Sequence, residues 1–308
     1  MQQFRSLQDA DLNATWLTIG AFDGVHLGHQ KIIRELVAGA HLIGAPAALL
    51  SFDPHPVEVL RGPQTAFYLS TQEEKAELLA ELGLDALVVE TFDEHLATTS
   101  AREFMERIKQ QLDIRQLWIG HDFAMGHNRE GDFDTLSAYG EELGFSVHPV
   151  SALELDGEVV SSSRIRRALG RGAVDEAEKL LGRPYSLMGT VSEGAGRGSS
   201  IGIPTANLEI WPKRVVPASG VYVCRAHVGG QDWPAVSNIG VRPTFEDKLL
   251  APVVESHLLD YHNDEVDGEK LRLSFVARLR DEQRFSSVDE LLEQIQRDIE
   301  QARQILKG

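Results

Sequence analysis

At 308 residues the chain is long for one domain, and its 42% hydrophobic and 25% charged residues are ordinary for a globular protein, so we expect two domains. The net charge of −17 argues against a general nucleic-acid-binding surface and means that polyanionic ligands must be met by local positive groups or a metal ion. A single cysteine, Cys224, excludes an internal disulfide. The polar start lacks a signal-peptide core and no run of 18 apolar residues occurs, so we expect a cytoplasmic protein without a membrane span.

Strands and helices alternate through the first half of the chain. A capping box is predicted at residues 70–73 and a helix cap at residues 100–103, and Pro54 and Pro56 are expected to stop any regular element. The alternation predicts a parallel, doubly wound sheet, which binds ligands at the carboxyl ends of its strands. The strands are expected at residues 16–19, 47–52, 86–90, 117–119 and 145–150.

The segment after the first strand is a strand-to-helix turn rich in glycine and histidine. His26 and His29 stand at the mouth of a helix, where free backbone N–H groups and the positive end of the dipole suit an anion. Three glycines would let a bulky ligand approach the backbone: Gly20, Gly24 and Gly28. The pattern indicates stabilisation of charge on a phosphate, although the histidines could also be a surface pair or metal ligands.

Other unusual residues also fall at strand ends. Residues 53–56 (DPHP) follow the second strand, and His121 and Asp122 follow the fourth. A further stretch, residues 160–172, has three serines at a helical start and several arginines, which would form a second phosphate cradle. Read separately, these stretches could be a polar loop and an N-cap with a solvated basic face. The clustering of three segments at the ends of strands, namely the Gly- and His-rich turn, residues 53–56 and the His121–Asp122 segment, indicates an active site.

Beyond residue 182 the pattern changes to short alternating strands with frequent Gly and Pro. Strands are expected at residues 220–228, 233–238, 253–259 and 270–279, which predicts a small antiparallel barrel. A terminal helix follows a predicted capping box at residues 287–290. Its apolar stripe is interpreted as core and not as a cofactor surface; its members are Leu291, Leu292, Ile295, Ile299, Ala302, Ile305 and Leu306.

The motifs of the first half resemble those of the nucleotidylyltransferases. The string G-A-F-D-G-V-H-L-G-H is similar to the signature of one branch, the bacterial bifunctional riboflavin kinase/FMN adenylyltransferases. Ser162, Ser163 and Arg166 match the S-S-T-x-I-R motif, with Ser163 in place of Thr. The segment from Ile119 is similar to G-x-[DN]-F-x-F-G, but Met125 stands where an aromatic residue is usual.

The second half resembles riboflavin kinases. The P-T-A-N segment is intact, and its Thr205 and Asn207 would hold Mg²⁺. Glu255 corresponds to the catalytic glutamate of the family, whose implied role is general base for the riboflavin 5′-hydroxyl. The sequence departs from the family pattern at Ile203, at Ser199 and at the residue before Gly268, where a Tyr is missing.

The resemblance implies an adenylyltransferase domain at residues 1–182 and a kinase domain at residues 183–308. The second domain would phosphorylate riboflavin with ATP, and the first would join FMN to AMP from a second ATP, giving FAD and pyrophosphate. The catalytic residues implied are His26, His29, Ser163, Arg166 and Glu255. The binding residues implied are Gly20, Phe22, Asp23, Gly24, Gly28, Pro54, His55, Pro56, Asp122, Ser162, Gly198, Gly202, Pro204, Thr205, Asn207 and Asn238.

Three alternatives remain at this point. The first domain could use another phosphate acceptor or CTP, or only the adenylyltransferase could be active, the kinase module having drifted. A flavin-sensing or RNA-binding role is the third, and a basic patch at residues 164–171 would serve it. The expected partners are ATP, riboflavin and FMN, with neither nucleic acid nor membrane, and the oligomeric state is left open.

Overall fold

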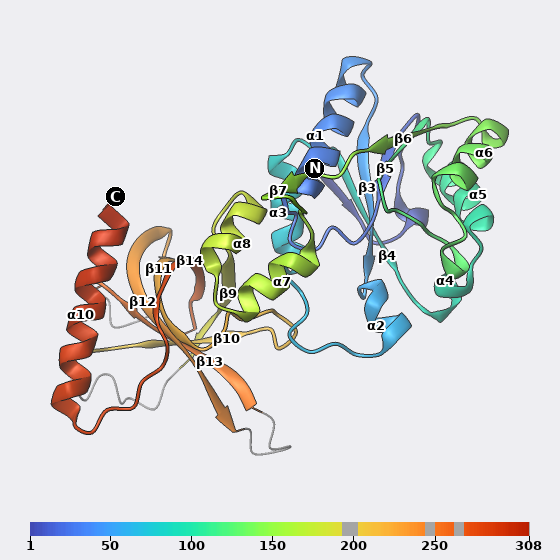
Figure 1. Ribbon diagram of the computed structural model, residues 1–308. Helices are drawn as coiled ribbons and strands as arrows, with labels where there is room; N and C mark the ends of the chain where they lie inside the picture. The colour runs from blue at the N-terminus through green and yellow to red at the C-terminus, as the bar shows by residue number, and fades with distance from the viewer. Residues whose placement is uncertain (193–202, 244–249, 262–267, 308) are drawn as a thin grey trace. The chain divides into compact units, whose positions relative to one another are not determined.

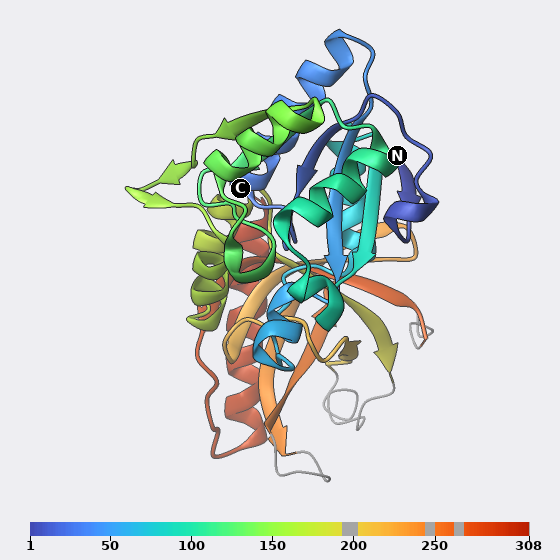
Figure 2. The same ribbon diagram turned by 90° about the vertical axis from the view of Figure 1, so that its right-hand side faces the viewer.

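The computed structural model describes residues 1–192, 203–243, 250–261 and 268–307 (Figures 1 and 2). The chain divides into two compact units, Met1–Ser162 and Ser163–Gly308. Helices α7 (Ser162–Gly170) and α8 (Val174–Leu181), which the predicted boundary after residue 182 assigns to the first domain, group almost wholly with the second unit.

The first unit is built on a six-stranded parallel sheet of order β1-β4-β3-β2-β5-β6. The strands are β1 (Gln2–Phe4), β2 (Trp16–Ile19), β3 (Ala47–Asp53), β4 (Ala86–Thr91), β5 (Gln116–Gly120) and β6 (Ser146–Val150). The predicted doubly wound sheet is confirmed, with the edge strand β1 as an addition. The polar start of the chain hid β1, which pairs with β4 over three residues.

The strand order reverses between β2 and β5, which are neighbours although three strands apart along the chain. In an open α/β sheet the ligand crevice lies outside the carboxyl ends of the strands at such a switch point. The Gly- and His-rich turn follows β2, and the His121–Asp122 segment follows β5. The topology therefore places both segments at the expected crevice.

Helices cover both faces of this sheet (Figure 1). Alternation along β2 and β3 separates two cores, with Leu17 and Leu50 in one and Trp16 and Leu49 in the other. The first core includes residues of α5 (Ala101–Leu112) and α6 (Phe133–Leu143), and the second includes residues of α1 (Leu27–Leu42) and α3 (Gln72–Glu81). The remaining elements are η1 (Leu7–Asp9), α2 (Pro56–Arg61), α4 (Glu94–Thr98), η2 (His127–Arg129), β7 (Glu154–Leu155) and β8 (Glu158–Val159).

Two local predictions were wrong. Pro56 does not stop a regular element but begins α2, where a proline is tolerated because the first helical N–H has no acceptor. The capping box of α3 pairs Thr71 with Glu74, one residue later than expected. The cap at Ser100 is confirmed, since its hydroxyl accepts from the Glu103 N–H.

The second unit contains a closed antiparallel barrel of order β10-β13-β12-β11-β14-β9. The strands are β9 (Ser186–Ser192), β10 (Ala206–Ile210), β11 (Gly220–Val228), β12 (Gln231–Pro243), β13 (Leu250–Leu258) and β14 (Lys270–Arg280). The predicted barrel is confirmed, but β9 and β10 were missed. Gly189 interrupts the sequence pattern of β9, and β10 begins inside the P-T-A-N motif.

Helix α10 (Val288–Lys307) packs on β11 and β12. Ser287 caps it by accepting from the Glu290 N–H. Of its apolar stripe, Ala302 is buried, whereas Leu291 and Ile295 line a cavity between the helix and the barrel. Among the helices described, none is both long enough and apolar enough to cross a membrane.

Candidate active sites

The turn after β2 holds an unusual backbone. Phe22 and Val25 both have positive φ, at 48° and 41°, a conformation costly for side chains with a Cβ. Gly24 has φ 79°, and a Cβ at this position would lie 2.9 Å from the Leu69 Cβ. Glycine is therefore required at position 24 by both conformation and space.

Asp23 fastens this turn to the segment before α3. Its buried carboxylate accepts from the backbone N–H groups of Leu69, at 2.9 Å, and Ser70, at 3.2 Å, and the Gly24 N–H donates to the Ser70 hydroxyl at 3.1 Å. Through these hydrogen bonds Asp23 holds the turn in place. A direct contact between Asp23 and a ligand stays a prediction.

The two histidines form one stack at the start of α1. His26 is the N-cap, and its Nδ1 accepts from the His29 backbone N–H at 3.3 Å. The ring centroids of His26 and His29 are 3.6 Å apart, and His29 stacks on Phe22 at 4.5 Å. Because Nδ1 of His26 is an acceptor, neutral His26 carries its proton on Nε2.

The electrostatic environment keeps His29 uncharged. Burial, then the neighbouring His26 and the ammonium group of Lys75, lowers the pKa of His29 well below its ordinary value. Its buried Nδ1 has no hydrogen-bond partner in the described part of the chain. His29 is therefore a neutral imidazole at pH 7 with hydrogen-bonding capacity left over.

A cavity of about 650 Å³ opens at the carboxyl edge of the same sheet. Its walls are mainly apolar and come from the ends of four strands, including Phe52, Phe92, Phe123 and Met125. Gly20 lines it after β2, and two arginines line it as well, Arg61 and Arg129. A cavity of this size and lining suits a flat aromatic ligand with a polar end.

The other residues predicted for this unit lie in different places. Pro56 lines the cavity. His55 caps α2 and packs against Phe67 and Tyr68, and Pro54 directly precedes His55. The side chain of Asp122 is 84% exposed. Gly28 lies in the first turn of α1, where a Cβ would approach the His26 ring to 3.1 Å.

The serine and arginine motif lies at the start of α7. The Ser162 hydroxyl donates to the Asp23 carbonyl at 2.9 Å, so this serine braces the turn after β2. Ser163 is exposed, Arg166 is half-buried, and both belong to the second compact unit. Their action on the ligand of the first unit stays a prediction.

In the barrel, three predicted residues stand in one row across adjacent strands. Glu255 on β13 lies directly opposite Asn207 on β10 and Asn238 on β12. Residues opposite each other on neighbouring strands project to the same face of the sheet. A carboxylate is thus flanked by two amides.

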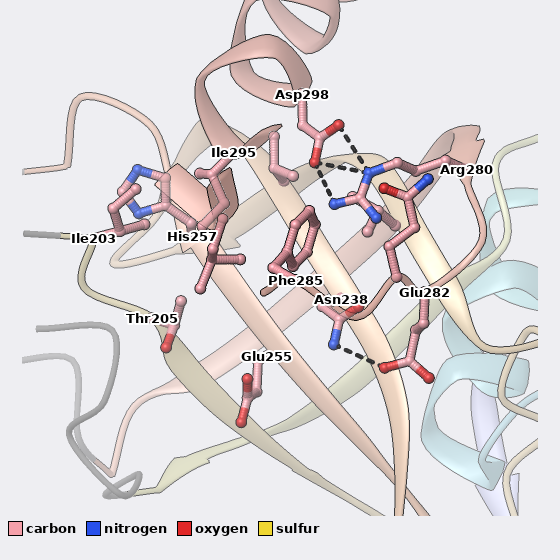
Figure 3. A pocket seen from close by; sticks show the side chains of 14 residues that line it. Ile203, Thr205, Asn238, Glu255, His257, Arg280, Glu282, Phe285, Ile295 and Asp298 are labelled. Carbon is pink, nitrogen blue, oxygen red and sulfur yellow. Dashed lines mark hydrogen bonds and ion pairs between the residues drawn. The ribbon is translucent and has the colours of Figure 1, made fainter. Parts of the chain in front are cut away.

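The face bearing this row forms a cavity of about 420 Å³ with α10 (Figure 3). Thr205, Asn238 and Glu255 all line it, whereas Asn207 is not among the lining residues. In this view the ring of Phe285 lies in the middle of the cavity, with Thr205 and Glu255 on one side of it and Arg280 on the other (Figure 3). The cavity combines a carboxylate end with an apolar wall.

The P-T-A-N segment is held in place by a residue that was not among the predicted site residues. His257 lies two residues after Glu255, and its Nδ1 is 2.7 Å from the Pro204 carbonyl oxygen. This contact fixes the backbone just before Thr205. The predicted Gly198 and Gly202 lie outside the described residues.

A buried ion pair closes the other end of the cavity. Both carboxylate oxygens of Asp298, which is 2% exposed, accept from the Arg280 guanidinium at 2.7 to 3.1 Å. Gln294 donates to the same carboxylate at 2.9 Å. Asp298 comes three residues after Ile295 and so falls on the apolar face of α10. A charged residue on an apolar helix face is the sequence feature that could have revealed it.

Similarity to known proteins extends over nearly the whole chain. The family model described as FAD synthetase matches residues 8–164, and the one described as riboflavin kinase matches residues 181–306. A bifunctional riboflavin kinase/FMN adenylyltransferase of Pseudomonas fluorescens is 40% identical over 93% of this chain and 91% of its own. The protein of the same description from Haemophilus influenzae is 36% identical over 98% of both chains.

A solved structure also matches over the same extent. The crystal structure of a Streptococcus pneumoniae protein described as a macrolide-efflux protein is 29% identical and has a TM-score of 0.89, covering 98% of both chains. The two proteins share their fold.

Proposed function

The chain belongs to the bifunctional riboflavin kinase/FMN adenylyltransferases, and we propose on that premise how its two sites divide the work. The enzyme phosphorylates riboflavin to FMN with ATP and adenylylates FMN with ATP to FAD and pyrophosphate. We assign the second reaction to the parallel sheet and the first to the barrel. The match of one family model to each part supports this assignment.

In adenylyl transfer an FMN phosphate oxygen attacks the α-phosphorus of ATP, and the bond from that phosphorus to pyrophosphate breaks. The nucleophile is already an anion, so no general base is needed. The requirement is to place it in line and to neutralise the charge that develops. The first turn of α1, the Nε2–H of His26 and the neutral ring of His29 are suited to this task, and Ser163 and Arg166 are proposed to complete it.

We place the isoalloxazine ring of FMN in the apolar cavity of the first unit. Met125 lines this cavity together with Phe52, Phe92 and Phe123, so an apolar wall remains although the usual aromatic residue is absent. Arg61 or Arg129 would meet a polar group of the flavin at the cavity mouth.

In the kinase reaction the attacking group is the neutral 5′-hydroxyl of riboflavin. It must lose a proton to Glu255 as it attacks the γ-phosphorus and ADP leaves. The observation that carries this role is the position of Glu255 on the wall of the cavity that Thr205 and Asn238 also line. Nothing in the described residues favours the alternative of a kinase that has drifted.

Mg²⁺ fits the donors at this end of the cavity. The hydroxyl of Thr205 and the amide oxygen of Asn207 are hard oxygen ligands, and Thr205 is exposed to the cavity. Mg²⁺ commonly takes most of its ligands from phosphates and water, so two protein donors are enough. When bound, Mg²⁺ would neutralise phosphate charge.

We also propose that the functional boundary lies after residue 182 and that the enzyme works in the cytoplasm, where ATP and flavins are available. Its proposed partners are these small molecules and not nucleic acid, in keeping with a net charge of −17. Chromatography of products formed from Mg-ATP with riboflavin or with FMN tests the whole assignment. FAD from both substrates, with FMN as an intermediate, is expected; no FAD from FMN would contradict it.

A further inference from the structure

A buried amine lies directly beneath the turn that follows β2. Lys75 of α3 is only 5% exposed, and its Nζ donates to the Ala21 carbonyl at 3.2 Å and to the Ser51 hydroxyl at 2.8 Å. The Ser51 hydroxyl also donates to the Ala21 carbonyl, at 3.3 Å. One carbonyl just after the carboxyl end of β2 thus accepts from two donors, one on α3 and one on β3.

The fixed carbonyl determines where the next N–H points. In a trans peptide the carbonyl of Ala21 and the N–H of Phe22 point in opposite directions. Since the carbonyl points at Lys75, the Phe22 N–H points away from it, and in the described residues nothing accepts from that N–H. Phe22 also has a positive φ, a conformation that persists only when surrounding contacts enforce it.

The amine has electrostatic as well as geometric consequences. Three titratable groups act on it or respond to it: the carboxylates of Asp23 and Asp53, which favour its charged form, and His29, whose pKa it helps to lower. Burial is the largest effect and lowers the pKa of Lys75 to about 8. A buried charge of this kind weakens folding, so its presence needs another reason.

We propose that Lys75 is a positioning residue for adenylyl transfer: its buried ammonium group holds the Ala21–Phe22 peptide so that the Phe22 N–H faces the nucleotide phosphates. The inference rests on the assignment of adenylyl transfer to the first unit. It adds a residue that no motif of the chain contains. The placement of Lys75 on the apolar face of α3, four residues before the buried Leu79, is the sequence feature that could have revealed it.

The test is the pH dependence of the turnover rate for FAD formed from FMN at saturating substrates. A neutral amine donates more weakly than an ammonium group, so loss of the Lys75 proton should loosen the peptide and the wild-type rate should fall above about pH 8. FMN formation by the barrel of the same chain should not follow that profile. Lys75→Met should be slower by about 10- to 100-fold and should lack this alkaline fall, since a misplacement near 1 Å costs about that much.

Lys109→Met is the matched control. Lys109 also donates to backbone carbonyls, those of Ile114 and Gly144, but near the amino end of β5. This variant should keep the wild-type profile. An alkaline fall that persists in Lys75→Met, or a Lys75→Met rate within twofold of wild type, would overturn the proposal.

A second variant covers the case in which Lys75→Met does not fold. Ser51→Ala removes one acceptor of the ammonium group and should move the alkaline fall to lower pH; an unmoved fall would overturn the proposal. His29→Ala separates failure of this proposal from failure of the assignment on which it rests. If His29→Ala leaves FAD formation intact, the assignment of adenylyl transfer to the first unit has failed, whatever the Lys75 variants show.

Discussion

The two sites differ in the role of their carboxylate groups, and the difference follows from the charge of the attacking group at each site. At the parallel sheet the attacking phosphate is an anion, and the proposed site offers neutral imidazoles, helix N–H groups and a buried lysine beneath the turn. Asp23, the acidic residue of that turn, is occupied by backbone donors. In the barrel the attacking group is a hydroxyl, and a carboxylate, Glu255, lines the cavity. One enzyme thus needs a base at one site only.

Glu255→Gln should produce the largest effect and make this contrast clearest. The amide keeps the shape of the side chain but cannot accept the hydroxyl proton, so FMN formation should fall by about 10²–10⁴. FAD formation from supplied FMN should stay within twofold of wild type. Glu209→Gln, at an exposed position on β10 outside the cavity lining, is the control and should change neither rate.

His29→Ala should produce the converse loss. Removing one preorganised group at a developing charge costs about 10²–10³, so FAD formation from FMN should fall by that factor and FMN formation should not. His41→Ala, near the other end of α1 and paired with Asp85 at the surface, is the control. Wild-type FAD synthesis by His29→Ala would remove the residue from the mechanism.

Gly24→Ala tests whether the turn of the first unit is as tightly packed as described. Gly24→Ala places a Cβ both at a positive φ and too close to the Leu69 side chain. Gly44→Ala also has a positive φ, 70°, but nothing lies within 4 Å of its Cβ. We expect a loss of about 1 kcal/mol for Gly44→Ala and about 2–3 kcal/mol for Gly24→Ala.

Urea unfolding can measure this difference in the first unit alone. With Trp211 and Trp233 replaced by Phe, the fluorescence of Trp16 and Trp118 reports on that unit. Equal losses in the two glycine variants would contradict the close contact.

Lys75→Met should stabilise the first unit while slowing its reaction. A pKa lowered from 10.5 to about 8 corresponds to a cost of about 3 kcal/mol below pH 8, part of which the lost hydrogen bonds offset. Between pH 8 and 10.5 the unfolded state binds more protons than the folded state, so wild-type stability recovers with rising pH.

The gain in free energy of unfolding should therefore be about 1–2 kcal/mol at pH 7 and should vanish toward pH 10.5. The same fluorescence measurement checks it. A gain independent of pH would contradict the buried charge.

The sequence predicted most of this architecture because hydrophobic period and turn residues act locally. The parallel strands, the histidine turn and the Glu255 strand were all readable from pattern or motif. The polar strand β1 was not, since its pairing with β4 is a tertiary contact. Lys75, Arg280 and Asp298 were missed for a related reason: their importance comes from burial, and a charged residue in a sequence reads as exposed.

A complementation experiment tests most directly that the two chemistries occupy separate sites. Glu255→Gln and His29→Ala chains would be given riboflavin and Mg-ATP, singly and mixed, and the flavins separated by chromatography. Glu255→Gln alone should leave riboflavin unchanged, His29→Ala alone should accumulate FMN, and the mixture should make FAD. A variant that loses both activities, or a mixture that accumulates FMN without FAD, would contradict the division of labour between the two units.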